Sequence, residues 1–193
     1  MPRDTRMVKH WYFFISFRNS FREYSSSLQI WQVKNKRVRN AFRVDTENPI
    51  MVYVDFSPNG RLMATGPQNF GGVHIWSMRD GSLSILQDGT SFRALVLAVK
   101  FSPDGRYVTA SDSKGTIRTW NVRTSKLVRK WKAHDIAIRC ITFTPDGRGL
   151  VTGCNDRTIK YWDFQQPPDS REHLKFIGHA VRRSLVFSLF KRL

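Results

Sequence analysis

The sequence has few acidic residues and few cysteines. Its 193 residues include 15 Asp or Glu against 32 Lys or Arg, and its two cysteines are Cys140 and Cys154. Two cysteines do not make a disulfide framework, so the composition favours a reducing, intracellular compartment, either nucleus or cytoplasm. The small acidic share leaves a formal net charge of +17, which points to anionic partners.

Long apolar runs and cofactor motifs are also missing. The longest apolar run, from Trp11 to Phe17, is far shorter than the roughly 20 residues that cross a bilayer, so no membrane partner is expected. The pair Gly71-Gly72 is typical of a turn and not of a phosphate-binding loop. The five histidines and two cysteines have no paired ligand spacing, so neither a metal nor a cofactor is expected.

The excess positive charge lies mostly in the flanks. Residues 1–43 carry ten basic against two acidic residues, and residues 165–193 carry six against two, whereas residues 44–164 carry sixteen against eleven. The flanks could therefore bind nucleic acid. The basic run from Arg123 to Lys132 has two interpretations, a contact to a nucleic-acid backbone or an outer strand protected by charge, and the second is favoured.

A turn motif and a tryptophan recur with one period. The turns are Phe56-Ser-Pro-Asn-Gly60, Phe101-Ser-Pro-Asp-Gly105 and Phe143-Thr-Pro-Asp-Gly147. Pro followed by Asn or Asp and then Gly is the chemistry of a type I hairpin turn. The strand-end residues Trp31, Trp76, Trp120 and Trp162 are separated by 45, 44 and 42 residues. Such a period with a closing Trp-Asp pair, as at Trp162-Asp163, is typical of propeller blades.

The spacing predicts an all-β chain that forms a partial propeller of about four blades, each a four-stranded antiparallel sheet. Residues 1–27 form a basic, aromatic segment without a repeat marker, and residues 28–193 form the propeller fragment. The fragment divides into a half blade (28–44), full blades (49–88, 94–133 and 134–177) and an incomplete blade (178–193).

The stretch from Ile136 to Phe164 resembles WD-repeat proteins. In that family a loop His, a turn Asp, a strand hydroxyl and the Trp indole form a hydrogen-bonded chain. The matching residues here are His134, Asp156, Thr152 and Trp162. A His, a hydroxyl and a carboxylate also occur in acyl-transfer triads, but the resemblance implies a structural role, so no catalytic residue and no enzyme activity are expected. Counting back from Trp120 in the second repeat gives Lys114 at the Asp position and Ala110 at the hydroxyl position. Only the third repeat is therefore expected to hold the complete hydrogen-bonded set.

The order of features from Met51 to about Phe187 is similar to the later repeats of the fungal Tup-type, Groucho-like corepressors. The residues that carry this resemblance run from Val151 to Asp163 and from Lys175 to His179. The resemblance implies a scaffold that binds other proteins, such as a DNA-bound transcription factor, through one face of the propeller. The loop positions expected on that face are Ser113, Asp135, Ile136 and Asn155. The alternative function is an RNA- or ribosome-associated scaffold held by the basic flanks.

An open arc of blades leaves sheet faces and strand edges uncovered. We therefore expect a homo-oligomer in which copies complete the propeller, or a truncated copy of a larger gene. Light scattering on the purified chain should give a mass above 22.5 kDa, and a well-behaved monomer of that mass would contradict the oligomer.

Overall fold

The computed structural model describes residues 26–34, 37–46, 51–67, 72–89, 94–164 and 174–177. Every regular element in this part of the chain is a β-strand, and no helix occurs there. Residues 1–25 of the predicted N-terminal segment and the incomplete blade predicted at 178–193 lie outside the described residues. The all-β prediction is therefore confirmed for the part that the structure describes.

The chain divides into two compact units, residues 1–50 and residues 51–193. In the first unit, β1 (Ser26–Lys34) and β2 (Arg37–Thr46) form an antiparallel hairpin, with a bulge between Ile30 and Trp31. This hairpin lies where the half blade was expected. The blade boundaries given above stay a prediction.

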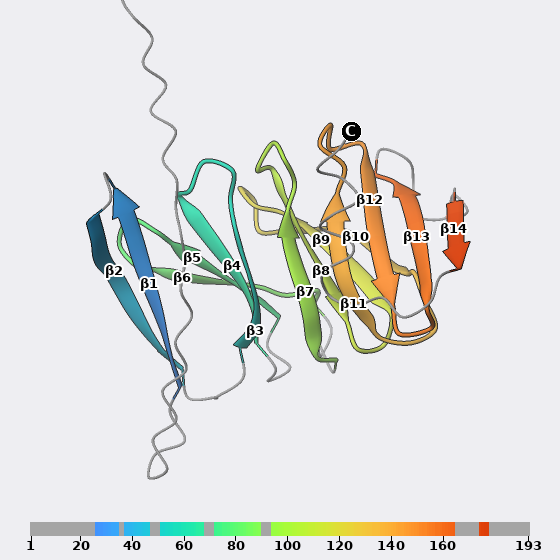
Figure 1. Cartoon of the computed structure of the whole chain (residues 1–193), viewed down its shortest axis with the longest axis horizontal. Coiled ribbons are helices and arrows are strands. Elements are labelled where there is room, and N and C mark those ends of the chain that lie inside the picture. Colours follow the sequence, from blue (N-terminus) through green and yellow to red (C-terminus); the bar gives the residue numbers. More distant parts are fainter. Residues whose placement is uncertain are drawn as a thin grey trace, which may run out of the picture. The chain divides into compact units, whose positions relative to one another are not determined.

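The second unit contains three four-stranded antiparallel sheets, each built from consecutive strands (Figure 1). Sheet 1 contains β3 (Met51–Phe56), β4 (Leu62–Pro67), β5 (Val73–Ser77) and β6 (Leu83–Leu86). Sheet 2 contains β7 (Val96–Phe101), β8 (Tyr107–Asp112), β9 (Thr116–Asn121) and β10 (Leu127–Lys132). Sheet 3 contains β11 (Ile138–Phe143), β12 (Gly149–Cys154), β13 (Thr158–Asp163) and β14 (Leu174–Ile177). This is the architecture of a partial β-propeller.

Two apolar clusters lie between successive sheets. The first joins sheets 1 and 2, with Ile75 and Leu86 packed near Val99 and Trp120. The second joins sheets 2 and 3, with Ala98 and Ile117 packed near Ile138 and Leu150. The first strands of the three sheets are neighbours, since β7 contacts both β3 and β11. The sheets are therefore held mainly by apolar burial across their faces, as expected for stacked blades.

The recurring turn has one hydrogen-bonding pattern in all three sheets. The amide of the closing glycine donates to the carbonyl three residues earlier, at 2.8 to 2.9 Å, for Gly60, Gly105 and Gly147. These glycines have φ of 66°, 70° and 70°, a range that favours glycine. The first residue, Ser57, Ser102 or Thr144, donates its hydroxyl to the Asn or Asp two positions on. The turn predicted from the sequence is present at each site.

The first strands of sheets 2 and 3 begin two residues after the stretches singled out in the sequence. The predicted blade 94–133 begins at Ala94 and the WD-like stretch begins at Ile136, whereas β7 and β11 begin at Val96 and Ile138. In sheet 2 the backbone of Leu95 bonds to Ser113 of the β8–β9 turn. In sheet 3 the Ala137 carbonyl accepts from Asn155 of the β12–β13 turn. These residues therefore connect loops to turns at the sheet end instead of extending the regular ladder.

Replacing Gly115, in the β8–β9 turn, is predicted to destabilise the protein more than replacing Gly81, in the β5–β6 turn. Its φ is +79°, and an added Cβ would lie 2.0 Å from the carbonyl oxygen of His134. Gly81 has a similar φ of +73° but nothing within 4 Å of such a Cβ. Gly81→Ala should cost about 1 kcal/mol from backbone conformation alone, and Gly115→Ala about 1–3 kcal/mol more. Urea unfolding of both variants checks this, and equal losses would contradict it.

Candidate functional site

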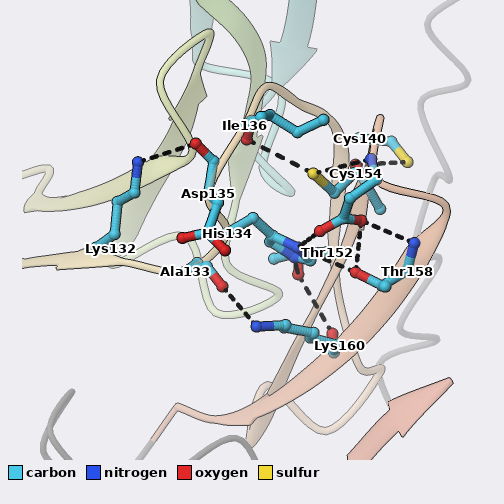
Figure 2. Close-up of polar contacts among 12 residues, drawn as sticks. Lys132, Ala133, His134, Asp135, Ile136, Cys140, Thr152, Cys154, Thr158 and Lys160 are labelled. Atoms are coloured by element: carbon cyan, nitrogen blue, oxygen red, sulfur yellow. Dashed lines mark hydrogen bonds and ion pairs between the residues drawn. The ribbon is translucent and has the colours of Figure 1, made fainter. Parts of the chain in front are cut away.

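The structure brings His134, Thr152, Asp156 and Trp162 together at one end of sheet 3. Figure 2 shows His134 beside Thr152. The indole N–H of Trp162 donates to Thr152 Oγ1 at 3.0 Å. His134 lies between the other two, with Nε2 2.7 Å from Thr152 Oγ1 and Nδ1 3.3 Å from Asp156 Oδ2. His134 comes from the β10–β11 loop, Asp156 from the β12–β13 turn, and the remaining two from strands β12 and β13. The chain of contacts fixes the incoming loop onto sheet 3.

Thr158 is a further member that the sequence analysis missed. Its hydroxyl donates to Asp156 Oδ1 at 2.6 Å and lies 3.2 Å from His134 Nδ1, while its amide donates to Asp156 Oδ1 at 2.8 Å. A threonine at the start of β13 gives no signal of its own, because threonine is common in strands. Its contacts limit the orientations open to the Asp156 carboxylate.

The carboxyl of Asp156 has a lowered pKa. Burial raises this pKa, but hydrogen bonds from Thr158, His134 and Cys154 outweigh burial and bring the pKa from 3.8 down to about 2. The ionised form is therefore the one that the surrounding donors hold. Asp156 is a charged acceptor throughout the neutral range.

The His–hydroxyl–carboxylate arrangement is closed to a substrate. His134 and Thr152 are 2% and 0% exposed. Thr152 Oγ1 is engaged by both the indole N–H and the imidazole. An attacking hydroxyl needs room for the group that it attacks, and a buried oxygen with two protein partners has none. The geometry therefore supports a structural role for these residues.

His134, Cys154 and Asp156 are also close enough to one another to share a metal ion, with their ligand atoms within 4.8 Å. Each of these atoms already has a partner in the protein. The Cys154 sulfur contacts the carbonyl oxygen of Ile136 and the amide of Asp156, both at 3.5 Å. Burial raises the pKa of the Cys154 thiol, which disfavours the thiolate that binds metals. The spacing of the residues does not reveal this cluster, because His134 is 20 residues before Cys154 and 22 before Asp156 and comes from a different loop.

Sheet 2 has a different polar network at the same end, which the sequence analysis also missed. Arg118 is 7% exposed and lies between two buried carboxylates, with Nε 2.7 Å from Asp88 and Nη1 2.5 Å from Asp112. The side chain of Asp112 also accepts from the amides of Lys114 and Thr116. Sheet 2, where the sequence places Lys114 and Ala110, thus has this ion-pair network in place of the set around His134. Asp88 lies in the β6–β7 loop, the counterpart of the loop that carries His134.

The tryptophans of sheets 1 and 2 find other acceptors. Trp76 donates its indole N–H to Thr65 Oγ1 at 3.1 Å, as Trp162 does to Thr152. Trp120 donates to the carbonyl oxygen of Gln87, at 2.9 Å, because Ala110 occupies the position of the strand hydroxyl. The indole N–H groups of Trp76, Trp120 and Trp162 are thus all paired, each by the acceptor that its own sheet or loop supplies.

Three of the four residues expected on the partner-binding face are exposed there. Asp135 and Ile136 lie in the β10–β11 loop, and Asn155 lies in the β12–β13 turn. Ile136 keeps 46% of its surface accessible. Ser113 is half-buried, and its hydroxyl oxygen accepts from the amide of Leu95 at 3.2 Å. The structure thus groups these residues at the same loops, with Ser113 engaged in holding the backbone.

The basic run on the outer strand β10 makes contacts within the chain. Lys130 pairs with Asp88 at 2.9 Å, and Lys132 donates to the carbonyl oxygens of Lys114 and Asp135. The guanidinium of Arg129 donates to the carbonyl oxygen of Phe164 and lies over its ring, 5.0 Å from the centroid. These contacts favour the outer-strand interpretation over a nucleic-acid contact for β10.

Comparison with known proteins identifies repeats of a named family. Residues 81–121 and 125–163 match the family model for the WD domain, G-beta repeat. Each match begins just before the last strand of one sheet and ends after the third strand of the next, so the sequence repeat is offset by one strand from the sheet. The chain therefore contains WD40 repeats, and proteins with such repeats are generally scaffolds and not enzymes.

Several curated proteins are similar to this chain over part of their length. WD repeat-containing protein VIP3 of Arabidopsis thaliana is 29% identical over 120 residues, which are 52% of this chain and 37% of that protein. Transcription initiation factor TFIID subunit 5 of Caenorhabditis elegans is 32% identical over 39% of this chain and 11% of that protein. Human pre-mRNA-processing factor 17 is 30% identical over 44% of this chain and 15% of that protein. The chain thus matches well under half the length of each relative.

Removing the positive charge of Arg118 should destabilise the protein strongly. Arg118→Met would leave the carboxylates of Asp88 and Asp112 facing each other in a buried site, at a cost of about 3–5 kcal/mol. The matched control is Arg106→Met, because the Arg106–Asp104 pair is exposed at 78% and 51% of its side chains, and its loss should change stability by less than about 0.5 kcal/mol. Urea unfolding of both variants is the measurement. Similar losses in the two would show that the buried network adds nothing.

The contribution of Asp156 to the stability of the folded protein should be lost at acid pH. Because the folded-state pKa, about 2, is below the ordinary aspartate value of 3.8, Asp156 contributes stability above pH 3.8, and this contribution is lost as the pH falls toward 2. Asp156→Asn should therefore unfold more easily than the wild type at neutral pH, by about 1 kcal/mol, and the difference should shrink across that range. Unfolding of both proteins by urea at several pH values measures the difference. A difference that is constant from pH 5 to pH 2 would contradict the prediction.

Proposed function

We propose that this chain, whose second and third sheets contain WD40 repeats, is a protein-interaction scaffold of the transcriptional-corepressor type. The site that we assign to the partner is the sheet end formed by the β10–β11 loop and the β12–β13 turn. The observation that carries the proposal is the pairing of an exposed loop surface with a buried polar support. Asp135 and Ile136 are exposed, while the preceding residue, His134, is buried and bonded to sheet 3.

A fixed loop is suited to recognition because little conformational freedom is lost when a partner binds. Backbone contacts add to the support that His134 gives. The amides of Ala133 and His134 donate to the Gly115 carbonyl at 2.9 and 3.1 Å, and Asn155 donates to the Ala137 carbonyl at 3.0 Å. The loop is thus tied to the turns of both sheet 2 and sheet 3. The surface that it presents is rigid.

The named relatives support a regulatory setting. They include a transcription initiation factor subunit and a pre-mRNA-processing factor. By analogy we place this chain in the nucleus or the cytoplasm, bound to other proteins such as a DNA-bound transcription factor. Among the described residues, no helix is long and apolar enough to cross a membrane. The Tup-type assignment and the homo-oligomer remain part of the proposal.

An affinity capture with matched variants tests the function. The full chain, the loop variant Ile136→Asp and the opposite-end variant Arg148→Ser would be used as baits, with captured proteins identified by mass spectrometry. We expect the wild type and Arg148→Ser to capture the same transcriptional regulator and Ile136→Asp to capture less than about a tenth as much, since a charge would replace an apolar contact at the interface. Arg148 is an exposed residue of the β11–β12 turn, so its replacement should not disturb the fold.

Two results would contradict the proposal. The first is equal capture by all three baits, which would place the interface elsewhere. The second is capture dominated by RNA-binding or ribosomal proteins that nuclease treatment removes. This would favour the alternative scaffold held by the basic flanks.

A further inference from the structure

We infer that the exposed surface around Ile136 binds an acidic peptide segment that places an apolar side chain against Ile136. This inference rests on the proposed function and adds the chemistry of the partner. The surface is called the basic loop patch below. It consists of Ile136 and four exposed cations, Lys114, Lys132, Arg139 and Arg157.

Contacts place these residues around one another. Lys132 Nζ donates to the carbonyl oxygens of Lys114 and Asp135, which joins the end of β10 to the β8–β9 turn and the β10–β11 loop. The carbonyl oxygen of Ile136 lies 3.5 Å from the Cys154 sulfur, at the start of the turn that carries Arg157. Figure 2 shows Ile136 beside Cys154 and the side chain of Lys132 pointing to the carbonyl oxygen of Asp135. Arg139, on β11, donates to Asn155 Oδ1 of that turn at 3.2 Å.

The positive charges of the patch are not neutralised by these contacts. Lys132 contacts carbonyl oxygens, and Arg139 contacts a side-chain amide, so each keeps its full charge. The neighbouring carboxylate of Asp156 is held by Thr158 and His134. The second carboxylate beside the patch is that of Asp135, in the β10–β11 loop. Four cations beside two carboxylates leave a net positive surface, which complements an acidic partner.

Arg157 occupies a backbone position that favours glycine. Its φ is 67°, and its amide donates to the carbonyl of Cys154 at 3.2 Å. Gly115 has φ of 79° and the same contact, to Asp112 at 3.2 Å, in the matching turn of sheet 2. A left-handed conformation is unfavourable for an arginine and is retained where the surroundings impose it or the side chain has a use. We assign the exposed guanidinium of Arg157 such a use, as a contact to the acidic partner.

An apolar residue among the cations favours a peptide over nucleic acid. Ile136 is 46% exposed, and its backbone is fixed by the contact to Cys154. A phosphate backbone would gain nothing from this apolar side chain. A peptide with alternating acidic and aliphatic residues can satisfy the cations and cover Ile136 at once.

The test measures binding of a fluorescein-labelled peptide of twelve alternating Glu and Leu residues to the full chain by anisotropy. Arg157→Gly removes one charge and relieves the unfavourable φ, so it should fold at least as well as the wild type while weakening binding about two- to fivefold. Ile136→Ser should weaken binding by a similar factor. Arg106→Ser, an exposed arginine in the turn at the other end of sheet 2, should leave binding unchanged. A Lys-Leu peptide should not bind.

The inference is overturned if Arg157→Gly and Ile136→Ser bind the acidic peptide as the wild type does. It is also overturned if single-stranded oligothymidine binds more tightly than the peptide and is released by the same variants. The proposed function is separable from it. If Ile136→Asp loses capture of the regulator but the wild type does not bind the acidic peptide, the proposed scaffold function is supported and only the acidic nature of the partner is rejected.

Discussion

The tryptophan at the end of the third strand is the constraint on which each sheet depends. Trp120 is fully buried, Trp162 packs partly buried against the core between sheets 2 and 3, and an indole N–H that is buried without an acceptor costs about 1–3 kcal/mol. Thr65 and Thr152 provide the acceptor in sheets 1 and 3, whereas sheet 2 takes the carbonyl of Gln87 from its entering loop. In sheet 2 the tryptophan therefore holds the entering loop directly, whereas in sheet 3 it does so through Thr152 and His134.

Sheets 2 and 3 hold their entering loops with different chemistry. In sheet 3 the loop is tied through His134, which contacts Thr152 and the Asp156 carboxylate in a set of hydrogen bonds that reinforce one another. In sheet 2 the tie is an arginine between Asp88 and Asp112, in which the attraction must offset the cost of burying three charges. Both devices place a loop side chain under the sheet end, so the position is constrained by geometry while its chemistry is free to vary.

This freedom explains what could be predicted from the sequence. The strands and the Pro-Asn/Asp-Gly turns follow from local chemistry and a fixed period, and both are found in the structure. The set of His134, Thr152, Asp156 and Trp162 was expected from the resemblance to WD-repeat proteins, and the structure brings these residues together. The Arg118 network does not follow, because Asp88 lies in a loop of different length, 32 residues before Trp120. His134 precedes Trp162 by 28 residues, so the spacing from the loop side chain to the tryptophan differs between the two sheets. Side chains that are brought together by the conformation of a loop do not recur at a fixed spacing in the sequence.

The same anchoring links stability to function. A loop held from below by buried polar contacts can display unfavourable groups on its outer side without losing its shape. Ile136 exposed to water and Arg157 in a left-handed conformation are both costly in the free chain. They lie on the two segments that His134 and Asp156 fasten together. A recognition surface needs such groups, because an apolar side chain and unneutralised cations are what a partner can cover and pair. The buried contacts thus supply the stability that the exposed groups use.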